Sequence, residues 1–194
     1  MRICLYGASS NELESIYVEK TKALGVALAK RGHNLVYGGG ARGLMGAAAS
    51  GVVEGGGSVI GVAPNFFNVD GVLFQECEEM IYTETMRERK RIMEEKADAF
   101  IVVPGGLGTF DELFEIMTLK QLGQHEKPIA MYNINGYYDA FEKLLAKAIE
   151  GKFMTQKSKE ICPLFDDADK LLSYIENYDA EDYDFTIMKK VEGK

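Results

Sequence analysis

The chain has 194 residues, 46% of them hydrophobic, and its 22 Lys and Arg against 30 Asp and Glu give a net charge of −8. This length fits one domain that buries a core without disulfides or metal. The negative charge argues against a general affinity for nucleic acid or anionic membranes. No uninterrupted apolar run approaches the ~18 residues of a membrane span, and the widely separated Cys4, Cys77 and Cys162 suit reduced thiols. The expected location is therefore the cytoplasm.

Short apolar runs alternate with amphipathic segments along almost the whole chain. Several runs are continuously apolar, which suits parallel strands covered by helices on both faces. The runs predict strands over Ile3–Tyr6, Leu35–Tyr37, Val59–Val62, Glu79–Tyr82, Phe100–Val103 and Ile129–Tyr132. The amphipathic segments predict helices over Leu13–Arg31, Leu44–Glu54, Thr85–Lys96, Thr109–Leu122 and Tyr138–Glu150. The alternation indicates a single doubly wound, Rossmann-like α/β domain with a mostly parallel sheet over residues 1–178, followed by an acidic, loosely ordered tail over 179–194.

In such a sheet the ligand lies beyond the carboxyl ends of the strands, and three of these ends are rich in Gly or Ser. One of them, Gly38–Gly43, matches GxGxxG between a strand and a helix. A dinucleotide fold needs an acid at the end of the next strand to bind the ribose, but Ser58–Asn65 holds neither Asp nor Glu. The NAD-binding interpretation is therefore disfavoured. Two others remain open: a turn that brings backbone close to a phosphate, or close packing of the helix on the strand.

A second glycine-rich strand end, Pro104–Glu112, carries the stronger signal. It places three glycines in one turn, whose N–H groups can approach a phosphate at the start of the next helix. Thr109 stands at the expected helix N-cap, three residues before Glu112, and this is also the spacing of a capping box. Glu112 is therefore either a chemical group of a site or only a cap of its own helix.

The basic stretch Met86–Met93 is informative through its helical phase. On a helix, Arg89 and Lys90 share the face of the two methionines, which should turn toward the protein. Two cations directed inward need anionic partners, either acids or a bound phosphate. The alternative is a solvated surface run. Thr85 and Glu88 have the spacing of a capping box, which predicts the helix start next to these cations.

Taken together, these residues resemble the LOG ("lonely guy") family, whose members are nucleoside 5′-monophosphate phosphoribohydrolases, many of which release cytokinin bases. The resemblance rests on the order of three motifs: the glycine-rich segment Gly38–Gly46, the pair Arg89 and Lys90, and PGGxGTxxE at Pro104–Glu112. It covers nearly the whole chain. Relatives have often been labelled lysine decarboxylases, but the sequence offers no evident lysine for pyridoxal-phosphate chemistry.

The resemblance implies hydrolysis of the bond between a purine-type base and ribose 5-phosphate, with AMP or an N6-modified AMP as substrate and no metal or redox cofactor. The family's catalytic carboxylate and arginine fall on Glu112 and Arg89. A carboxylate beside the ribosyl carbon stabilises an oxocarbenium-like transition state and activates water, and Arg89 should keep it ionised at neutral pH. The substrate-binding positions so implied are Ser9, Gly39, Gly40, Met86, Lys90, Gly105, Gly106, Gly108, Thr109, Asp111 and Thr118.

The chain departs from the family pattern in three places. Position 107 is Leu where relatives often carry an aromatic residue, and position 111 is Asp where Glu is common. The region Phe66–Cys77, where we expect contacts with the base, resembles the plant enzymes poorly. Specificity for cytokinin bases therefore stays open, although the reaction itself does not depend on this region.

The resemblance also implies a homodimer with the site near its interface. The helix after the glycine turn would supply apolar side chains for such an interface, although the same side chains would equally suit a core: Leu113, Phe114, Met117 and Leu122. The competing hypothesis is a non-catalytic carrier that binds a nucleotide or cofactor on the same fold. The presence of both Glu112 and Arg89 favours the enzyme, because a carrier has no need of that pair.

Overall fold

The computed structural model describes residues 1–180 and centres on a seven-stranded sheet in which every pair of neighbouring strands is parallel. The strands are β1 (Arg2–Tyr6), β2 (Asn34–Tyr37), β3 (Val59–Pro64), β4 (Glu79–Thr83), β5 (Ala99–Val102), β6 (Ile129–Tyr132) and β7 (Leu164–Phe165). The predicted tail over 179–194 falls outside the described residues from position 181 onward.

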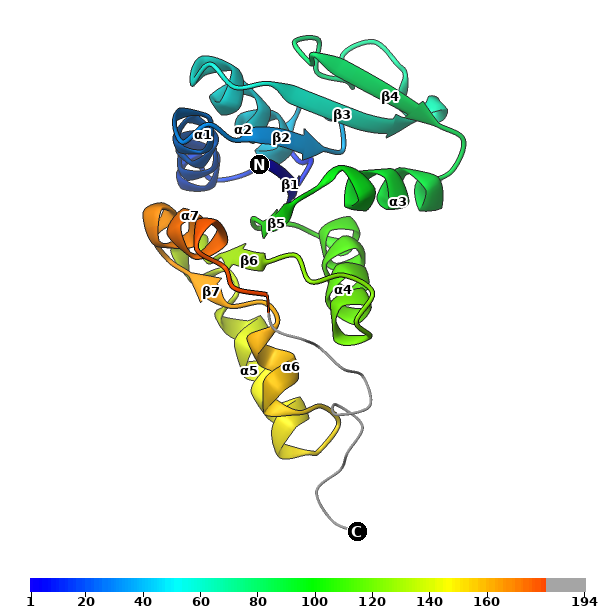
Figure 1. Ribbon diagram of the computed structural model, residues 1–194. Helices are drawn as coiled ribbons and strands as arrows, with labels where there is room; N and C mark the ends of the chain where they lie inside the picture. The colour runs from blue at the N-terminus through cyan, green and yellow to red at the C-terminus, as the bar shows by residue number, and fades with distance from the viewer. Residues whose placement is uncertain (181–194) are drawn as a thin grey trace.

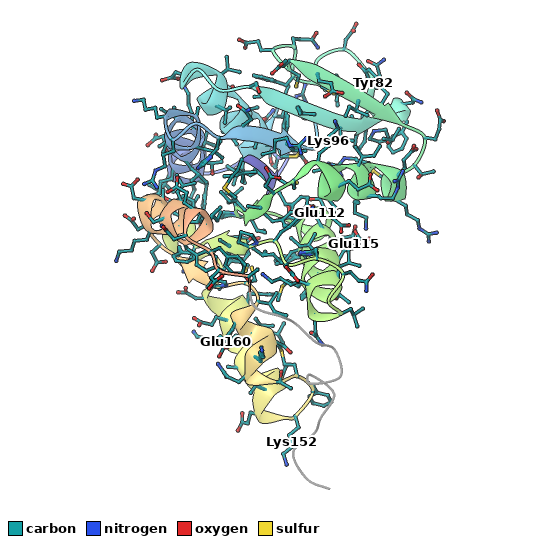
Figure 2. The ribbon with its side chains drawn as sticks, viewed as in Figure 1. Tyr82, Lys96, Glu112, Glu115, Lys152 and Glu160 are labelled. Carbon is teal, nitrogen blue, oxygen red and sulfur yellow. The ribbon has the colours of Figure 1, made fainter. Side chains whose placement is uncertain are left out.

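Seven α-helices within residues 1–180 connect or follow these strands, and none of them is both long and apolar enough to cross a membrane. They are α1 (Ser15–Lys30), α2 (Gly43–Glu54), α3 (Met86–Lys96), α4 (Leu107–Gln121), α5 (Asp139–Glu150), α6 (Gln156–Glu160) and α7 (Ala168–Glu176). α6 lies against α5, where Lys159 pairs with Glu142 at 2.8 Å, and both helices extend away from the sheet beyond β7 (Figures 1 and 2).

The strand order β4-β3-β2-β1-β5-β6-β7 determines where a ligand can bind. The chain moves outward from β1 to β4, then crosses back through α3 to place β5 on the other side of β1 (Figure 1). The loops after β1 and β5 therefore diverge to opposite faces of the sheet, and the crevice between them is the topological switch point where α/β sheets bind ligands. The two segments that follow these strands are Gly7–Ser10 and Pro104–Glu112.

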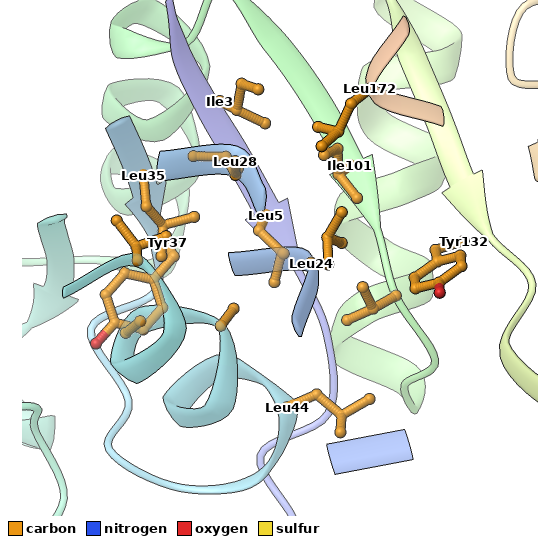
Figure 3. Packing of buried hydrophobic residues seen from close by; sticks show 14 of the residues in the cluster. Ile3, Leu5, Leu24, Leu28, Leu35, Tyr37, Leu44, Ile101, Tyr132 and Leu172 are labelled. Atoms are coloured by element: carbon orange, nitrogen blue, oxygen red, sulfur yellow. The ribbon is translucent and has the colours of Figure 1, made fainter. Parts of the chain in front are cut away.

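Alternate residues of each strand pack into two separate hydrophobic cores, one on each face of the sheet, as expected for parallel strands buried on both faces. Ile3 and Leu5 of β1 pack with α1, α2 and α7 on one face (Figure 3). Cys4 and Tyr6 pack with α3, α4 and α5 on the other. The doubly wound, Rossmann-like prediction is confirmed, and the sheet is parallel throughout.

All six predicted strands and all five predicted helices are present, with ends that shift by one or two residues. The prediction missed β7, α6 and α7, which lie beyond residue 155. β7 has two residues, too few to show an alternating or continuously apolar pattern, and the five residues of α6 complete little more than one helical turn.

Candidate active site

The start of α3 sets the direction of its basic side chains. The Thr85 hydroxyl accepts a hydrogen bond from the Glu88 N–H at 3.1 Å, so the predicted cap is confirmed. The Glu88 carboxylate accepts from the Glu84 N–H at 2.9 Å, one residue earlier than in a capping box. With the start fixed in this way, Arg89 turns inward and is 5% exposed, while Lys90 is half-buried. The prediction that both cations face the protein is confirmed.

Arg89 and Glu112 form a buried ion pair between α3 and α4. The guanidinium Nη1 donates to Glu112 Oε1 at 2.7 Å, and the Nε donates to the carbonyl of Val62 at 3.0 Å. The guanidinium also passes directly over Gly38, where a Cβ atom would collide with it. Figure 2 shows Glu112 at the end of α4 nearest α3. Arg89 is thus held from two sides, and it orients the carboxylate.

Burial and the ion pair act in opposite directions on Glu112. Its side chain is 10% exposed, and burial raises the pKa of this carboxyl because the charged form loses solvation. The nearby guanidinium of Arg89 lowers the pKa and partly offsets this effect. The result is a carboxylate with little solvation and one strong partner, which is the environment expected of a functional group.

The prediction that Thr109 caps α4 is wrong. The helix begins at Leu107, with Gly106 in an extended conformation at the N-cap and no side chain bonded to the cap. Thr109 is therefore the third residue of the helix, buried against Gly105, whose added Cβ would collide with it. Because the start lies two residues earlier than expected, Glu112 is not at the capping position. Its carboxylate bonds to Arg89 instead, and this removes the capping interpretation of Glu112.

A cleft of about 300 Å³ opens beside this pair, at the switch point of the sheet. Its volume lies at the lower end of the roughly 300–1,000 Å³ typical of small-molecule sites. A larger cavity of about 710 Å³ next to β4 contains neither Arg89 nor Glu112 among its lining residues. The residues that line the smaller cleft come from five segments at strand ends and helix starts: Gly7, Ala8, Ser9, Met45, Phe67, Met86, Arg89, Gly106, Leu107, Gly108, Thr109, Asp111 and Glu112.

Eight of the thirteen predicted site residues lie in this cleft, and the other five do not line it. Lys90 bridges α3 to α4, with its Nζ 2.9 Å from Asp111 and 2.8 Å from Glu115. Gly105 lines a neighbouring recess together with Tyr137, and Thr118 is exposed farther along α4. The roles predicted for these residues as direct substrate contacts stay predictions.

The glycines after β2 hold a loop in place and do not line the cleft. Gly39 has a φ of +75°, a conformation that favours glycine, and its carbonyl accepts from the Phe74 N–H at 2.9 Å. Gly40 pairs with Leu73 in an isolated antiparallel bridge. The contacts of this segment are thus with the loop before β4, and both interpretations left open for it stay predictions.

Sequence reasoning missed the apolar wall of the cleft. Met45 of α2 and Phe67, in the short 3-10 helix Asn65–Phe67 after β3, line it together with the predicted Met86. The residue range around Phe67 was expected to contact the base, but no periodic signal singled out this ring. Gly38 was also missed as a site residue, although the glycine-rich pattern that contains it was the available signal.

Comparison with known proteins identifies the family. A family described as "Possible lysine decarboxylase" matches residues 45–175. A cytokinin riboside 5′-monophosphate phosphoribohydrolase of Arabidopsis thaliana is 37% identical over 184 residues, which cover 95% of this chain and 86% of that protein. The corresponding protein of Oryza sativa subsp. japonica is 38% identical over 180 residues, covering 93% and 74%. The chain belongs to the LOG family.

The two names attached to the LOG family point to different chemistry. A pyridoxal-phosphate decarboxylase uses a lysine that forms a Schiff base with the cofactor. The cleft described here is lined by Arg89 and Glu112, and no lysine is among its lining residues within 1–180. The residues of the cleft therefore suit the phosphoribohydrolase name of the relatives.

Solved structures share the fold at lower identity. The molybdenum cofactor carrier protein of Chlamydomonas reinhardtii superposes with a TM-score of 0.69 at 21% identity, covering 90% of this chain and 95% of that one. The molybdenum cofactor binding protein of Rippkaea orientalis gives 0.66 at 20% identity, covering 90% and 94%. These structures show that the LOG fold is shared with carriers.

Proposed function

We propose that this protein hydrolyses the N-glycosidic bond of a purine nucleoside 5′-monophosphate, AMP or an N6-modified AMP, to the free base and ribose 5-phosphate. The observation that carries the proposal is the buried Arg89–Glu112 pair, 2.7 Å between Nη1 and Oε1, at the wall of the switch-point cleft. Relatives at 37–38% identity over more than nine-tenths of the chain are named for this reaction on cytokinin ribotides.

The carboxylate of Glu112 acts at the ribosyl carbon. As the base leaves, positive charge develops at this carbon, and a nearby carboxylate with few competing water contacts stabilises it strongly. The same carboxylate accepts a proton from the attacking water, and a proton is delivered to the base nitrogen as its bond to the ribosyl carbon breaks, so that the carboxylate is regenerated. Arg89 keeps Glu112 ionised and oriented, and its bond to the Val62 carbonyl fixes the guanidinium in turn. In this mechanism, cleavage of the glycosidic bond uses only water and side chains of the protein, with no metal ion or other cofactor.

The start of α4 binds the 5′-phosphate. Its first N–H groups have no side-chain cap, and unbonded amides at a helix N-terminus favour an anion. An added Cβ would meet open space at Gly106 and Gly108, so backbone and ligand can approach closely at these two positions. Ser9, after β1, lines the same cleft and adds a hydroxyl.

The apolar wall of Met45, Phe67 and Met86 receives the base. Phe67 is 39% exposed and Met86 is 39% exposed, so both offer surface to a planar ligand. Stacking of a base on an aromatic ring is worth about 1–3 kcal/mol and tolerates substituents on the base. The wall therefore fits a purine and does not discriminate strongly between AMP and its N6-modified forms.

We further propose that the chain acts as a homodimer in the cytoplasm, with residues 1–178 as one nucleotide-binding domain. Leu107, Phe114 and Leu122 of α4 are 90%, 46% and 41% exposed, and they supply an apolar surface beside the cleft. Leu113 and Met117, which were also considered for this interface, are buried in the core below α4. Sedimentation of the wild type and of a Phe114→Lys variant tests the dimer, because a charge in the interface should give monomers.

The carrier hypothesis rests on structural neighbours at about 21% identity, which share the fold alone. A carrier binds its ligand and returns it unchanged. The test is to incubate the purified protein with AMP, isopentenyl-AMP and adenosine and to measure free base by chromatography. We expect base from the two monophosphates and far less from adenosine, since adenosine lacks the phosphate. Binding of the monophosphates with no base released would favour the carrier.

A further inference from the structure

Two consecutive tyrosines after β6 bond to the backbone of the glycine turn. The Tyr137 hydroxyl donates to the carbonyl of Gly105 at 2.6 Å, and the Tyr138 hydroxyl donates to the carbonyl of Val103 at 2.8 Å. The carbonyl between these two, that of Pro104, accepts from the Ala8 N–H at 3.0 Å. Three successive carbonyl oxygens at the end of β5 are therefore each fixed by a donor from outside the turn.

The direction of each carbonyl also sets the direction of the next N–H group. In a trans peptide the C=O and the following N–H point in opposite directions, and the described chain has no cis peptide bond. The carbonyl of Gly105 points to Tyr137, which is not among the residues that line the cleft, so the N–H of Gly106 points away from Tyr137. Gly106 lines both the recess that contains Tyr137 and the cleft in which we place the phosphate. The Tyr137 bond thus turns an amide toward the ligand and a carbonyl oxygen, which would repel a phosphate, away from it.

Tyr137 itself is held by the turn after β6. Asn135 and Gly136, directly before Tyr137, both have left-handed φ angles, +53° and +70°. The side chain of Asn133 accepts from the Tyr138 N–H at 2.7 Å and donates to the carboxylates of Asp139 and Asp166 at 2.9 Å. This network fixes the backbone from which the Tyr137 ring extends.

The ring of Tyr137 lies outside the catalytic cleft. It lines a recess of about 260 Å³, which shares only Ala8 and Gly106 with the cleft, together with Tyr17, whose ring meets it edge-on at 6.3 Å. Tyr137 is 40% exposed, so its ring contributes less to the core than the fully buried Tyr138. The short hydroxyl contact to Gly105 is the feature that packing alone does not require.

We infer that Tyr137 is a positioning residue that orients the Gly105–Gly106 peptide for binding of the 5′-phosphate. The inference rests on the proposed function, because it assumes that the start of α4 binds phosphate. It assigns Tyr137 no contact with the substrate. Its effect passes through one peptide plane, and so it should appear in binding of the phosphate group and not in cleavage of the glycosidic bond.

The test compares Tyr137→Phe with the wild type. The substitution removes the hydroxyl and keeps the ring, so the recess and the fold are retained. One hydrogen bond is worth on the order of 1 kcal/mol, so we expect the KM for AMP to rise about fivefold, with kcat changed by less than about twofold. The dissociation constant of ribose 5-phosphate, measured by calorimetry, should rise by the same factor. Tyr17→Phe, which removes a hydroxyl from the neighbouring ring, is the matched control and should leave both constants unchanged.

Each outcome decides the inference. An unchanged KM and an unchanged ribose 5-phosphate affinity in Tyr137→Phe would overturn it, and so would a loss confined to kcat. A protein that binds ribose 5-phosphate but releases no base would refute the proposed hydrolysis while leaving the Tyr137 comparison valid, because the calorimetric arm needs no turnover. A wild type that does not bind ribose 5-phosphate would overturn the phosphate site and this inference together.

Discussion

Replacing Glu112 with Gln tests the chemical role of the buried carboxylate. The amide has nearly the same shape and its oxygen can still accept a hydrogen bond from Arg89, so the change removes mainly the negative charge. Arg89 keeps its second bond, from Nε to the carbonyl of Val62 at 3.0 Å. The fold should therefore persist, although a buried guanidinium without its counter-ion is destabilising.

The expected fall in kcat follows from the two proposed roles of the Glu112 carboxylate. General base catalysis contributes about 10²–10⁴-fold, and stabilisation of charge at the ribosyl carbon adds to it. We expect Glu112→Gln to lower kcat by at least about 10³-fold, or about 4 kcal/mol in the barrier. The cost in stability should be smaller, about 1–3 kcal/mol, because hydrogen-bond geometry is retained.

The assay measures free base released from AMP, together with the affinity for AMP and the melting temperature of each variant. Glu176→Gln is the matched control: Glu176 also pairs with an arginine, at 2.9 Å from Arg31, but on α7, far along the chain from the cleft. The control should keep wild-type turnover. If Glu112→Gln kept wild-type turnover too, or lost activity only in proportion to its unfolded fraction, the catalytic role of Glu112 would be refuted.

Three further variants and two pH dependences provide additional tests. Gly108→Ala should stabilise α4 by up to about 1 kcal/mol in urea denaturation, because the added Cβ meets open space. The same methyl group should hinder the approach of the phosphate and raise the KM for AMP, and an unchanged KM would contradict the phosphate site. Phe67→Ala should raise the KM for AMP about tenfold and leave calorimetric binding of ribose 5-phosphate unchanged; weakening of both would mean that Phe67 does not contact the base. Since burial raises the pKa of Glu112, kcat/KM should fall on acidification with a midpoint above the ordinary 4.5 of a glutamate; a midpoint below that value would contradict the role of burial. Burial lowers the pKa of His125 to about 4 from 6.5, so the unfolded chain takes up a proton at this residue before the folded chain does as the pH falls. The free energy of unfolding should therefore drop by about 2 kcal/mol between pH 7 and 5. His125→Gln should make this dependence on pH less steep, and an equal dependence in both proteins would refute the contribution of His125.

The sequence predicts part of the arrangement of Arg89 and Glu112. Helical phase alone predicted that Arg89 turns inward, because two methionines share its face; Met93 is buried, whereas Met86 is 39% exposed and lines the cleft. Helical phase did not reveal that its partner is Glu112, 23 positions away, and only the resemblance to the LOG family brought the two together. Their meeting depends on the crossover that places β5 beside β1, and this placement is a property of the whole sheet.

The errors at α4 and in the cleft wall have local causes. Thr109 is a good capping residue, but Gly106 already occupies the N-cap, and an extended glycine needs no side-chain bond to begin a helix. The glycines at 39 and 40 matched a phosphate-binding pattern; they contact the loop before β4 and do not line the cleft, and their contact with substrate stays a prediction. Phe67 was not singled out because a ring in a three-residue helix has no periodicity to reveal its direction.

The most direct test of the central claim is a single turnover with the protein in excess over AMP, followed by quantification of both products. The account predicts one adenine and one ribose 5-phosphate for each AMP consumed. Recovery of intact AMP from a protein that binds it would contradict hydrolysis and favour a carrier. Formation of adenosine and inorganic phosphate would show that the cleft attacks the phosphate ester, and the assignment of Glu112 to the ribosyl carbon would fail.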